Sequence, residues 1–336
     1  MRTLAVGSKK KVLLVILLIL AGLILAYALF CAVAPRFFYP EFYPYAYKVA
    51  AIPDLWADFI PQGVTYSPYD GSTLICGYMP GDQASRIYRL GDKPVRIELE
   101  REDGTVYDGH AGGMTAAGDY IYISNASKLF VLRAEDVMNA ADGDVVRFIG
   151  HFEVPCRASF CSNSDGMVYV GDYHAEGYET EESHVMETAD GEHAAMVFGY
   201  RLDEEARFGV EEIPSVAYSV CDKVQGFAVT PEGVAILSCS YGLADSELKL
   251  YHAKDAGSFA YEGQDLPLYV LDSGCEIVTV RAPHMSEDIE YLDGGLLIAF
   301  EAGAKKYGGG ILPFSVRSVM RWASPEITSA IAKARE

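Results

Sequence analysis

The stretch PQGVTYSPYDGSTLICGYM, residues 61–79, reappears later in the chain as VQGFAVTPEGVAILSCSYG, residues 224–242. Each copy has a polar residue and a glycine, then alternating apolar residues, a turn that contains glycine, and a second strand-forming run. Alternation with a period of two around such a turn is typical of a β-hairpin. The two copies therefore predict the same hairpin at two places in one fold.

Three further copies of the hairpin occur. They are AGGMTAAGDYIYISNAS from Ala111, RASFCSNSDGMVYVGDYH from Arg157 and SEDIEYLDGGLLIAFEAG from Ser286. The residue pairs that open the five copies are Gln62-Gly63, Gly112-Gly113, Ala158-Ser159, Gln225-Gly226 and Glu287-Asp288. A third strand is predicted after every hairpin, and a fourth strand after four of them. Four-stranded units repeated along a chain are typical of a β-propeller, so we predict an all-β, five-bladed propeller over residues 48–322.

The fifth unit has no fourth strand of its own. After its third strand, the residues SPEITSAIAKARE predict a capped helix within the C-terminal segment, residues 323–336. The segment KVAAIP, residues 48–53, has the length of a strand and stands just before the first hairpin. Pairing the two ends of the chain would close the ring and protect its open edges. We predict this closure, with six blades as an alternative if residues 243–285 contain another blade.

An apolar run, residues 12–34, follows Lys9, Lys10 and Lys11. As a helix it would span about 35 Å, enough to cross the hydrocarbon core of a bilayer. Lysines before the run, without acidic residues, predict a cytoplasmic tail over residues 1–11, a transmembrane signal-anchor, and an extracytoplasmic domain of a single-pass cell-membrane protein. The alternative is a signal peptide cleaved after Ala34, although the run is long for such a peptide.

The linker that follows, residues 35–47, is rich in aromatic residues and proline. Amphipathic rings favour the headgroup layer of a membrane, so this linker would suit an interfacial collar. The same rings would equally suit packing on the domain. The sequence leaves these two alternatives open.

The chain is acidic outside its N-terminus. Residues 35–336 carry 23 of the 27 basic residues and all 47 acidic ones, a formal charge of 23 − 47 = −24. Such a field repels phosphate backbones, so we expect no nucleic-acid partner, whereas cations are attracted. Six of the seven cysteines lie in this part, and the sequence cannot choose among the disulfide pairings that they allow.

Polar residues recur at equivalent positions of the repeat. The sixth residues of the predicted second strands are Tyr78, Asn125, Asp172, Ser240 and Glu301. Propellers place the first strand of each blade along the central channel, so these residues and the first-strand entries should meet at one rim. We predict a rim site for a small molecule or an extracellular protein, formed by Gln62, His110, Asn125, Arg157, Asp172, Gln225 and Ser240. Two insertions, residues 175–193 and 252–267, are expected on a binding face.

Acidic side chains at the same rim indicate a second chemistry. Asp172, Glu287, Asp288 and Glu301 would offer the oxygen ligands that calcium prefers. Crowded carboxyls would also have raised pKa values, which suits acid/base work beside His110. A channel filled with water, whose polar residues bond one another, is the remaining alternative. No nucleophile elbow and no nucleotide-cradling motif is present in the sequence.

The repeat resembles a group of exported bacterial propeller-like proteins of unassigned activity, in PQGVTY, HAGGMT, VQGFAVTPEG and MSEDIEYLDGGLLIAFEAGAKKY. More distantly, its layout is similar to the calcium-dependent lactonase and strictosidine-synthase-like propellers. The second resemblance implies a channel metal, with Glu287, Asn125 and Asp172 in the ligand places, although Gln62 and Gln225 depart from that pattern. The expected function is therefore binding at the rim, with a calcium-dependent hydrolase or a structural envelope scaffold as alternatives.

Overall fold

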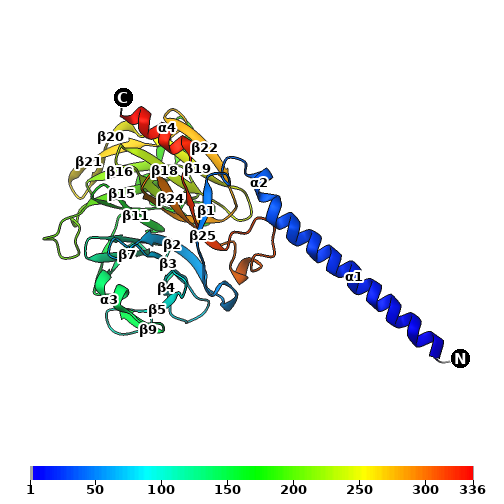
Figure 1. Cartoon of the computed structure of the whole chain (residues 1–336). Helices are drawn as coiled ribbons and strands as arrows, with labels where there is room; N and C mark the ends of the chain where they lie inside the picture. Colours follow the sequence, from blue (N-terminus) through cyan, green and yellow to red (C-terminus); the bar gives the residue numbers. More distant parts are fainter. Residues whose placement is uncertain (1–2, 336) are drawn as a thin grey trace.

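The blades of a five-bladed β-propeller make up most of the chain in a computed structural model that describes residues 3–335 (Figure 1). Each blade begins with an innermost strand that is followed by the second strand of its hairpin. These hairpins are β2 (Ile60–Tyr66) with β3 (Thr73–Tyr78), β6 (Gly113–Ala117) with β7 (Tyr120–Asn125), β11 (Phe160–Ser164) with β12 (Met167–Gly171), β17 (Val224–Val229) with β18 (Val234–Cys239), and β23 (Ser286–Leu292) with β24 (Gly295–Phe300). The five predicted hairpins are confirmed.

The outer strands complete each blade. Blade one adds β4 (Arg86–Arg89) and β5 (Val95–Glu100), blade two adds β8 (Lys128–Arg133) and β10 (Gly150–Glu153), blade three adds β15 (Ala195–Arg201) and β16 (Val216–Val220), and blade four adds β19 (Ser246–His252) and β22 (Glu276–Ala282). Short elements join them, namely α3 (Ala134–Asn139) and the 3₁₀ turns η1 (Leu55–Ala57), η2 (Glu182–His184) and η3 (Lys305–Tyr307).

Two blades borrow strands from elsewhere in the chain. The stretch VVRFIGHFEV, residues 145–154, is predicted from the sequence to form the fourth strand of blade two, but it divides into β9 (Asp144–Arg147) and β10. Strand β9 pairs in parallel with β5 of blade one. The hairpin of β20 (Lys254–Tyr261) and β21 (Gln264–Val270) joins the outer edge of blade three, where β21 runs parallel to β16. Residues 243–285 therefore hold no sixth blade, because their strands complete blades three and four.

The ends of the chain close the ring in blade five. Strand β1 (Ala46–Ala51) pairs antiparallel with β25 (Ser318–Trp322), so that Ala46 lies opposite Trp322 and Ala51 opposite Ser318. The predicted closure is confirmed, with a strand that begins at Ala46. Helix α4 (Pro325–Ala334) follows, and the side chain of its N-cap residue, Ser324, accepts a hydrogen bond from the Ile327 amide at 3.4 Å.

Helix α1 (Thr3–Val33) extends away from the propeller (Figure 1). It begins well before the predicted span, so most of the expected tail is helical, and Met1 and Arg2 lie outside the described residues. By length and composition it can cross a membrane, and it is the one such helix among residues 3–335. A short helix, α2 (Pro35–Phe38), connects it to the linker.

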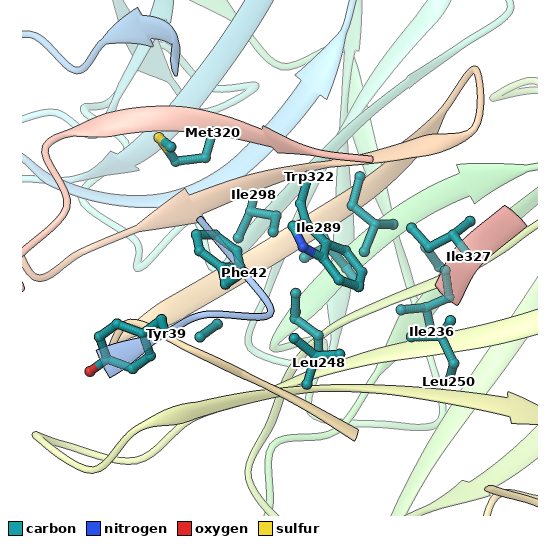
Figure 2. Packing of buried hydrophobic residues seen from close by; sticks show 14 of the residues in the cluster. Tyr39, Phe42, Ile236, Leu248, Leu250, Ile289, Ile298, Met320, Trp322 and Ile327 are labelled. Carbon is teal, nitrogen blue, oxygen red and sulfur yellow. The ribbon is translucent and has the colours of Figure 1, made fainter. Parts of the chain in front are cut away.

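The aromatic linker divides between the two alternatives that the sequence left open. Tyr39 and Phe42 are buried in the core cluster of the last two blades, and Phe42 lies beside Trp322 (Figure 2). Phe37 and Phe38 are exposed, with 76% and 52% of their surface accessible. The linker therefore contributes Tyr39 and Phe42 to the domain core, whereas Phe37 and Phe38 at its start stay largely exposed, with the Phe38 ring 5.0 Å from that of Phe314.

Three blades have a glycine at the same position of the repeat, namely Gly63, Gly113 and Gly226, and the packing of the blades requires it. At each of them an added Cβ would collide with backbone of the innermost strand of the following blade: at 2.3 Å from the amide nitrogen of Met114 for Gly63, 2.3 Å from that of Cys161 for Gly113, and 2.7 Å from that of Ile289 for Gly226. Side chains at these positions would hold neighbouring blades apart. The same contacts align Ser159-Phe160 of blade three with the glycine pairs, one residue later than the sequence alignment placed it.

Two buried acids tie the innermost strands together across the channel. Asp288 accepts hydrogen bonds from the amides of Val64 (3.4 Å) and Met114 (3.1 Å), which belong to blades one and two. Glu290 accepts from Thr65 Oγ1 (2.6 Å), Tyr66 N (2.9 Å), Thr115 Oγ1 (2.9 Å) and Asn163 Nδ2 (3.2 Å). The innermost strands face a channel rather than another strand, so these carboxyls replace the partners that a closed sheet would supply.

One pair of cysteines lies in contact in blade four. The sulfur atoms of Cys221, just after β16, and Cys239, the last residue of β18, are 3.7 Å apart. Among residues 3–335, no other pair of thiols is in such contact, and all seven cysteines are unbridged. The hydrogen bond with Cys239 lowers the pKa of Cys221, and the Lys249 ammonium adds to the lowering. A disulfide would require the two sulfurs to approach to ~2.05 Å.

We expect oxidised glutathione to join Cys221 to Cys239 and to raise the melting temperature by about 5 °C, because the bridge constrains the unfolded chain. Peptide mapping under non-reducing conditions should find this bridge, and Cys239→Ser should abolish both the bridge and the stabilisation. Cys275→Ser, which changes another partly buried thiol of the same core cluster, is the matched control. A bridge that includes Cys275 would contradict the prediction.

Candidate functional site

A cavity of about 520 Å³ opens where the hairpins of all five blades meet at one end of the channel. It is lined at the positions where innermost strands begin and second strands end. Its polar and aromatic lining residues are Gln62, Tyr78, His110, Asn125, Arg157, Ser159, Tyr173, Tyr178, Gln225, Ser240, Tyr241, Glu287, Glu301, Lys306 and Tyr307. Six of the seven residues expected at the rim lie in this lining, and Asp172 does not.

Irregularities in three innermost strands aim side chains into the cavity. The pairing register shifts between Pro61 and Val64, between Val224 and Gly226, and between Ser286 and Ile289. Gln62, Gln225 and Glu287 lie within these shifts. A β-bulge turns a side chain out of the regular alternation, and here it presents two amides and one carboxyl to the same space.

Two carboxyls, of Glu287 and Glu301, lie together in the lining. Glu287 is 2% exposed, and its Oε1 has no hydrogen-bond partner among the described residues. Glu301 accepts a hydrogen bond from Gln62 Nε2 at 3.1 Å. Burial raises the pKa of Glu287 well above its usual value, and the neighbouring Glu301 carboxyl raises it further. Burial also raises the pKa of Glu301, so the pair retains a proton more readily than two exposed carboxyls would.

An aromatic and cationic wall lies next to these carboxyls. The rings of Tyr78 and His110 stack with centroids 4.6 Å apart. Lys306 Nζ donates to Tyr78 Oη at 2.7 Å and lies 5.0 Å from the centre of the Tyr307 ring. Desolvation of the imidazolium by the surrounding protein lowers the pKa of His110 to about 4, and the positive charge of Lys306 lowers it further. His110 is therefore a neutral ring at pH 7, able to donate and to accept a hydrogen bond.

The insertion in blade three also contributes to the lining. It contains β13 (Met186–Thr188) and β14 (Gly191–His193), and its first residues bring Tyr178 to the cavity. Tyr178 meets the ring of Tyr173 edge-on at 5.6 Å. Arg157 Nη1 donates to the carbonyl of Glu179 at 2.6 Å, which holds the start of the insertion against the cavity.

Asp172 has a different role from the expected one. It is fully buried and accepts hydrogen bonds from the amides of Arg157 (2.7 Å) and Met196 (3.1 Å). Its other contact is His184 Nδ1 of the insertion, at 2.7 Å. Its oxygens are therefore occupied in fastening the insertion to blade three, and they do not reach the rim site.

The expected set of four metal ligands is not assembled. Asp172 is committed to His184, and Asp288 accepts hydrogen bonds from the strands of blades one and two, since the bulge between Ser286 and Ile289 directs it away from the cavity. Glu287 and Glu301 alone share the cavity. Within the described part of the chain, no group of three or more His, Cys, Asp or Glu side chains is close enough to hold a metal ion.

Several lining residues were missed from the sequence. Tyr173 and Tyr241 each directly follow a sixth strand residue, so extending the repeat by one position would have found them. Tyr178, Lys306 and Tyr307 lie in connecting segments without an equivalent in other blades. Nothing in the repeat could have placed those three.

No protein-family model matches the chain, and none of the curated proteins is similar to it in sequence. Solved structures do resemble it. A proposed oxidoreductase (glucose dehydrogenase) of Thermus thermophilus is 15% identical, with 82% of this chain and 98% of that one covered and a TM-score of 0.43. The PQQ-bound aldose sugar dehydrogenase of Streptomyces coelicolor is 16% identical, covers 76% of both chains and has a TM-score of 0.37. The glutaminyl cyclase of Myxococcus xanthus is 10% identical, covers 82% and 97%, and has a TM-score of 0.41. At these identities and TM-scores, the likenesses carry no argument about activity.

Proposed function

We propose that this chain is a membrane-anchored, extracytoplasmic propeller that binds a small hydroxyl-rich molecule, of sugar size, in the cavity at the channel end. One observation carries the proposal: a buried carboxyl oxygen of Glu287, which has no hydrogen-bond partner among residues 3–335, lines a cavity of amides and tyrosine rings. An unpaired buried acceptor is costly. A ligand that donates a hydrogen bond to it would remove that cost.

The rest of the lining supports a hydroxyl-rich ligand. The amides of Gln62, Asn125 and Gln225 both donate and accept hydrogen bonds, as hydroxyl groups do. Tyrosine rings offer flat apolar faces together with a polar edge, which suits the two faces of a sugar ring. A volume of about 520 Å³ lies in the usual range for small-molecule sites.

A second function is favoured by the carboxyl pair itself. Burial raises the pKa of Glu287 and of Glu301, so this pair holds a proton more readily than two exposed carboxyls would. Such a pair could serve as general acid and general base in hydrolysis of a glycoside or ester. A calcium-dependent form of this chemistry would need oxygen ligands beyond these two residues, from Gln62, Gln225 or the ligand.

The anchor in this proposal rests on α1. It is apolar along the predicted span, residues 12–34, and its side chains there are exposed. The lysines before that span favour a cytoplasmic N-terminus and a propeller outside. A reporter enzyme fused after Glu336 should accordingly be active outside the cytoplasm.

The cavity is tested with the full chain in detergent, by melting it against a panel of neutral mono- and disaccharides and against calcium chloride. A sugar that binds should raise the melting temperature, since it adds RT ln(1 + [L]/Kd) to stability. Glu287→Gln replaces one acceptor oxygen with an amide donor and should weaken that sugar about tenfold, the equivalent of one lost hydrogen bond. Glu153→Gln, at a carboxylate with 70% of its side chain exposed, is the control.

The change in stability of Glu287→Gln without ligand provides an independent test. The folded-state pKa of Glu287 is raised, so ionisation of the buried carboxyl costs stability as pH rises above its unfolded pKa. Glu287→Gln should therefore make the unliganded domain more stable at pH 7. Stabilisation of the wild type by calcium, lost in the variant, would favour the calcium-dependent hydrolase instead. A variant that keeps full sugar affinity would overturn the binding site.

A further inference from the structure

The segment between β24 and β25 reaches the N-terminal helix. Its residues 308–315 read GGGILPFS. Tyr27 Oη of α1 donates a hydrogen bond to the carbonyl oxygen of Ile311. The ring of Phe314 lies 6.1 Å from that of Phe30 in α1 and 5.0 Å from that of Phe38 in α2. We call residues 308–314 the apolar tip.

The contact with Tyr27 places the tip at a depth along α1. Val33, the last residue of α1, lies six positions after Tyr27. At about 1.5 Å per residue, Tyr27 lies ~9 Å before that end. The tip therefore extends beside the apolar span, rather than stopping at its boundary with the propeller.

Large apolar side chains of the tip and its surroundings are exposed. Ile311 is 62% exposed and Leu312 is 37% exposed. Trp56, 57% exposed, lies against the tip, since a Cβ at Gly309 would be 2.6 Å from its ring. Phe37 and Phe38 extend the same apolar surface onto α2. Surfaces of this kind mark contact with a protein or a membrane.

We propose that the apolar tip enters the bilayer beside α1, on the propeller's side, with lipid acyl chains as its partner. The proposal rests on the anchor proposed above. Continuity with the apolar span of α1 favours lipid over a protein partner, because a helix that crosses the bilayer holds the tip at that depth. Residues 308–316 carry no charge, Arg36 and Arg317 adjoin the apolar segments in the sequence, and Lys305 is paired with Asp58 Oδ2 at 3.0 Å. Cationic residues beside an inserted apolar segment suit anionic headgroups.

Docking of the tip would also hold one wall of the cavity in place. The segment that carries the tip begins at Glu301 and includes Lys306 and Tyr307, which line the cavity. A tip held in the bilayer would hold this wall in place and set the orientation of the propeller relative to the membrane. A single flexible linker after α1 would leave that orientation free.

The chain contains two tryptophans, and Trp322 is buried, which allows a direct test of depth. In the Trp56→Phe background, Ile311→Trp is introduced into the full chain, which is reconstituted in phosphatidylcholine vesicles with or without bromine on the acyl chains. We expect the added fluorescence to be lost in brominated vesicles, because bromine quenches indole at contact. Gln264→Trp is the matched control, on the β20–β21 hairpin, which lies across the propeller from α1 (Figure 1). Its fluorescence should persist.

A third reporter, Leu17→Trp in the middle of α1, separates the two proposals. Quenching of Leu17→Trp without quenching of Ile311→Trp would overturn docking of the tip and leave the anchor standing. Absence of quenching from both would refute the anchor itself. Quenching of Ile311→Trp by aqueous acrylamide, and not by bromolipid, would equally overturn docking and would assign the tip to a protein partner or to water.

Discussion

Replacing Phe42 with alanine should lower the free energy of unfolding by about 4 kcal/mol, the usual cost of removing a fully buried ring. Phe42 has no exposed surface, stacks on Trp322 with centroids 6.4 Å apart and meets Phe300 edge-on at 6.3 Å. It lies four residues before β1, so its loss leaves a cavity under the strand that closes the ring. Urea unfolding of the full chain in detergent, followed by circular dichroism, measures the change.

Phe37→Ala is the matched control, since the same linker carries this ring with 76% of its surface exposed. It should change the free energy of unfolding by less than about 0.5 kcal/mol. If the two substitutions changed the free energy of unfolding equally, Phe42 would not belong to the core. Closure of the ring by β1 would then contribute little to stability.

Replacing Glu290 with alanine should cost about 3 kcal/mol at pH 7. The carboxyl is 4% exposed and accepts hydrogen bonds from three blades. Its removal leaves buried donors such as the Tyr66 amide without a partner, at about 1–3 kcal/mol for each group that finds no substitute. Relief of a buried charge offsets part of this loss. Glu204→Ala, at an exposed site, should have almost no effect in the same urea titration.

The same residue should shape the dependence of stability on pH. Burial raises the pKa of Glu290 from 4.5 to about 7. The folded chain therefore binds more protons than the unfolded chain between these values, and its stability falls as pH rises through this window. The contribution is about 3 kcal/mol. Glu290→Gln should flatten this part of the profile, and a slope that is unchanged in the variant would show that another group titrates there.

The five hairpins and the strand that closes the ring could be predicted because local signals define them. Alternation in stretches such as residues 61–79, and a turn that contains glycine, specify a hairpin without reference to the rest of the chain. The partners of the outer strands could not be predicted in this way. Strands β9 and β21 show strand periodicity, yet each pairs in parallel with a strand of a neighbouring blade. Periodicity tells which residues form a strand and leaves open which edge it joins.

The candidate site divides along the same line. Repeat positions brought Gln62, His110, Asn125, Arg157, Gln225 and Ser240 to one cavity, because equivalent positions of equivalent blades lie on one circle. Asp172 occupies such a position, but its carboxylate is hydrogen-bonded to His184 of the insertion and does not line the cavity. The apparent equivalence of Glu287 and Asp288 also fails, since a bulge sends one into the cavity and the other toward blades one and two.

By itself, the sequence determined the apolar helix, the five repeated hairpins, the closing strand and the circle of polar positions, since each depends on composition or on a repeat with a fixed period. Only the tertiary structure decided which of those polar groups stay free. It paired Asp172 with His184, and it left one oxygen of Glu287 without a hydrogen-bond partner in the described part of the chain. It also brought the tip at Ile311 to Tyr27 of α1, across most of the length of the chain. Such contacts join residues far apart in sequence, and their geometry exists only once the blades have packed into a ring.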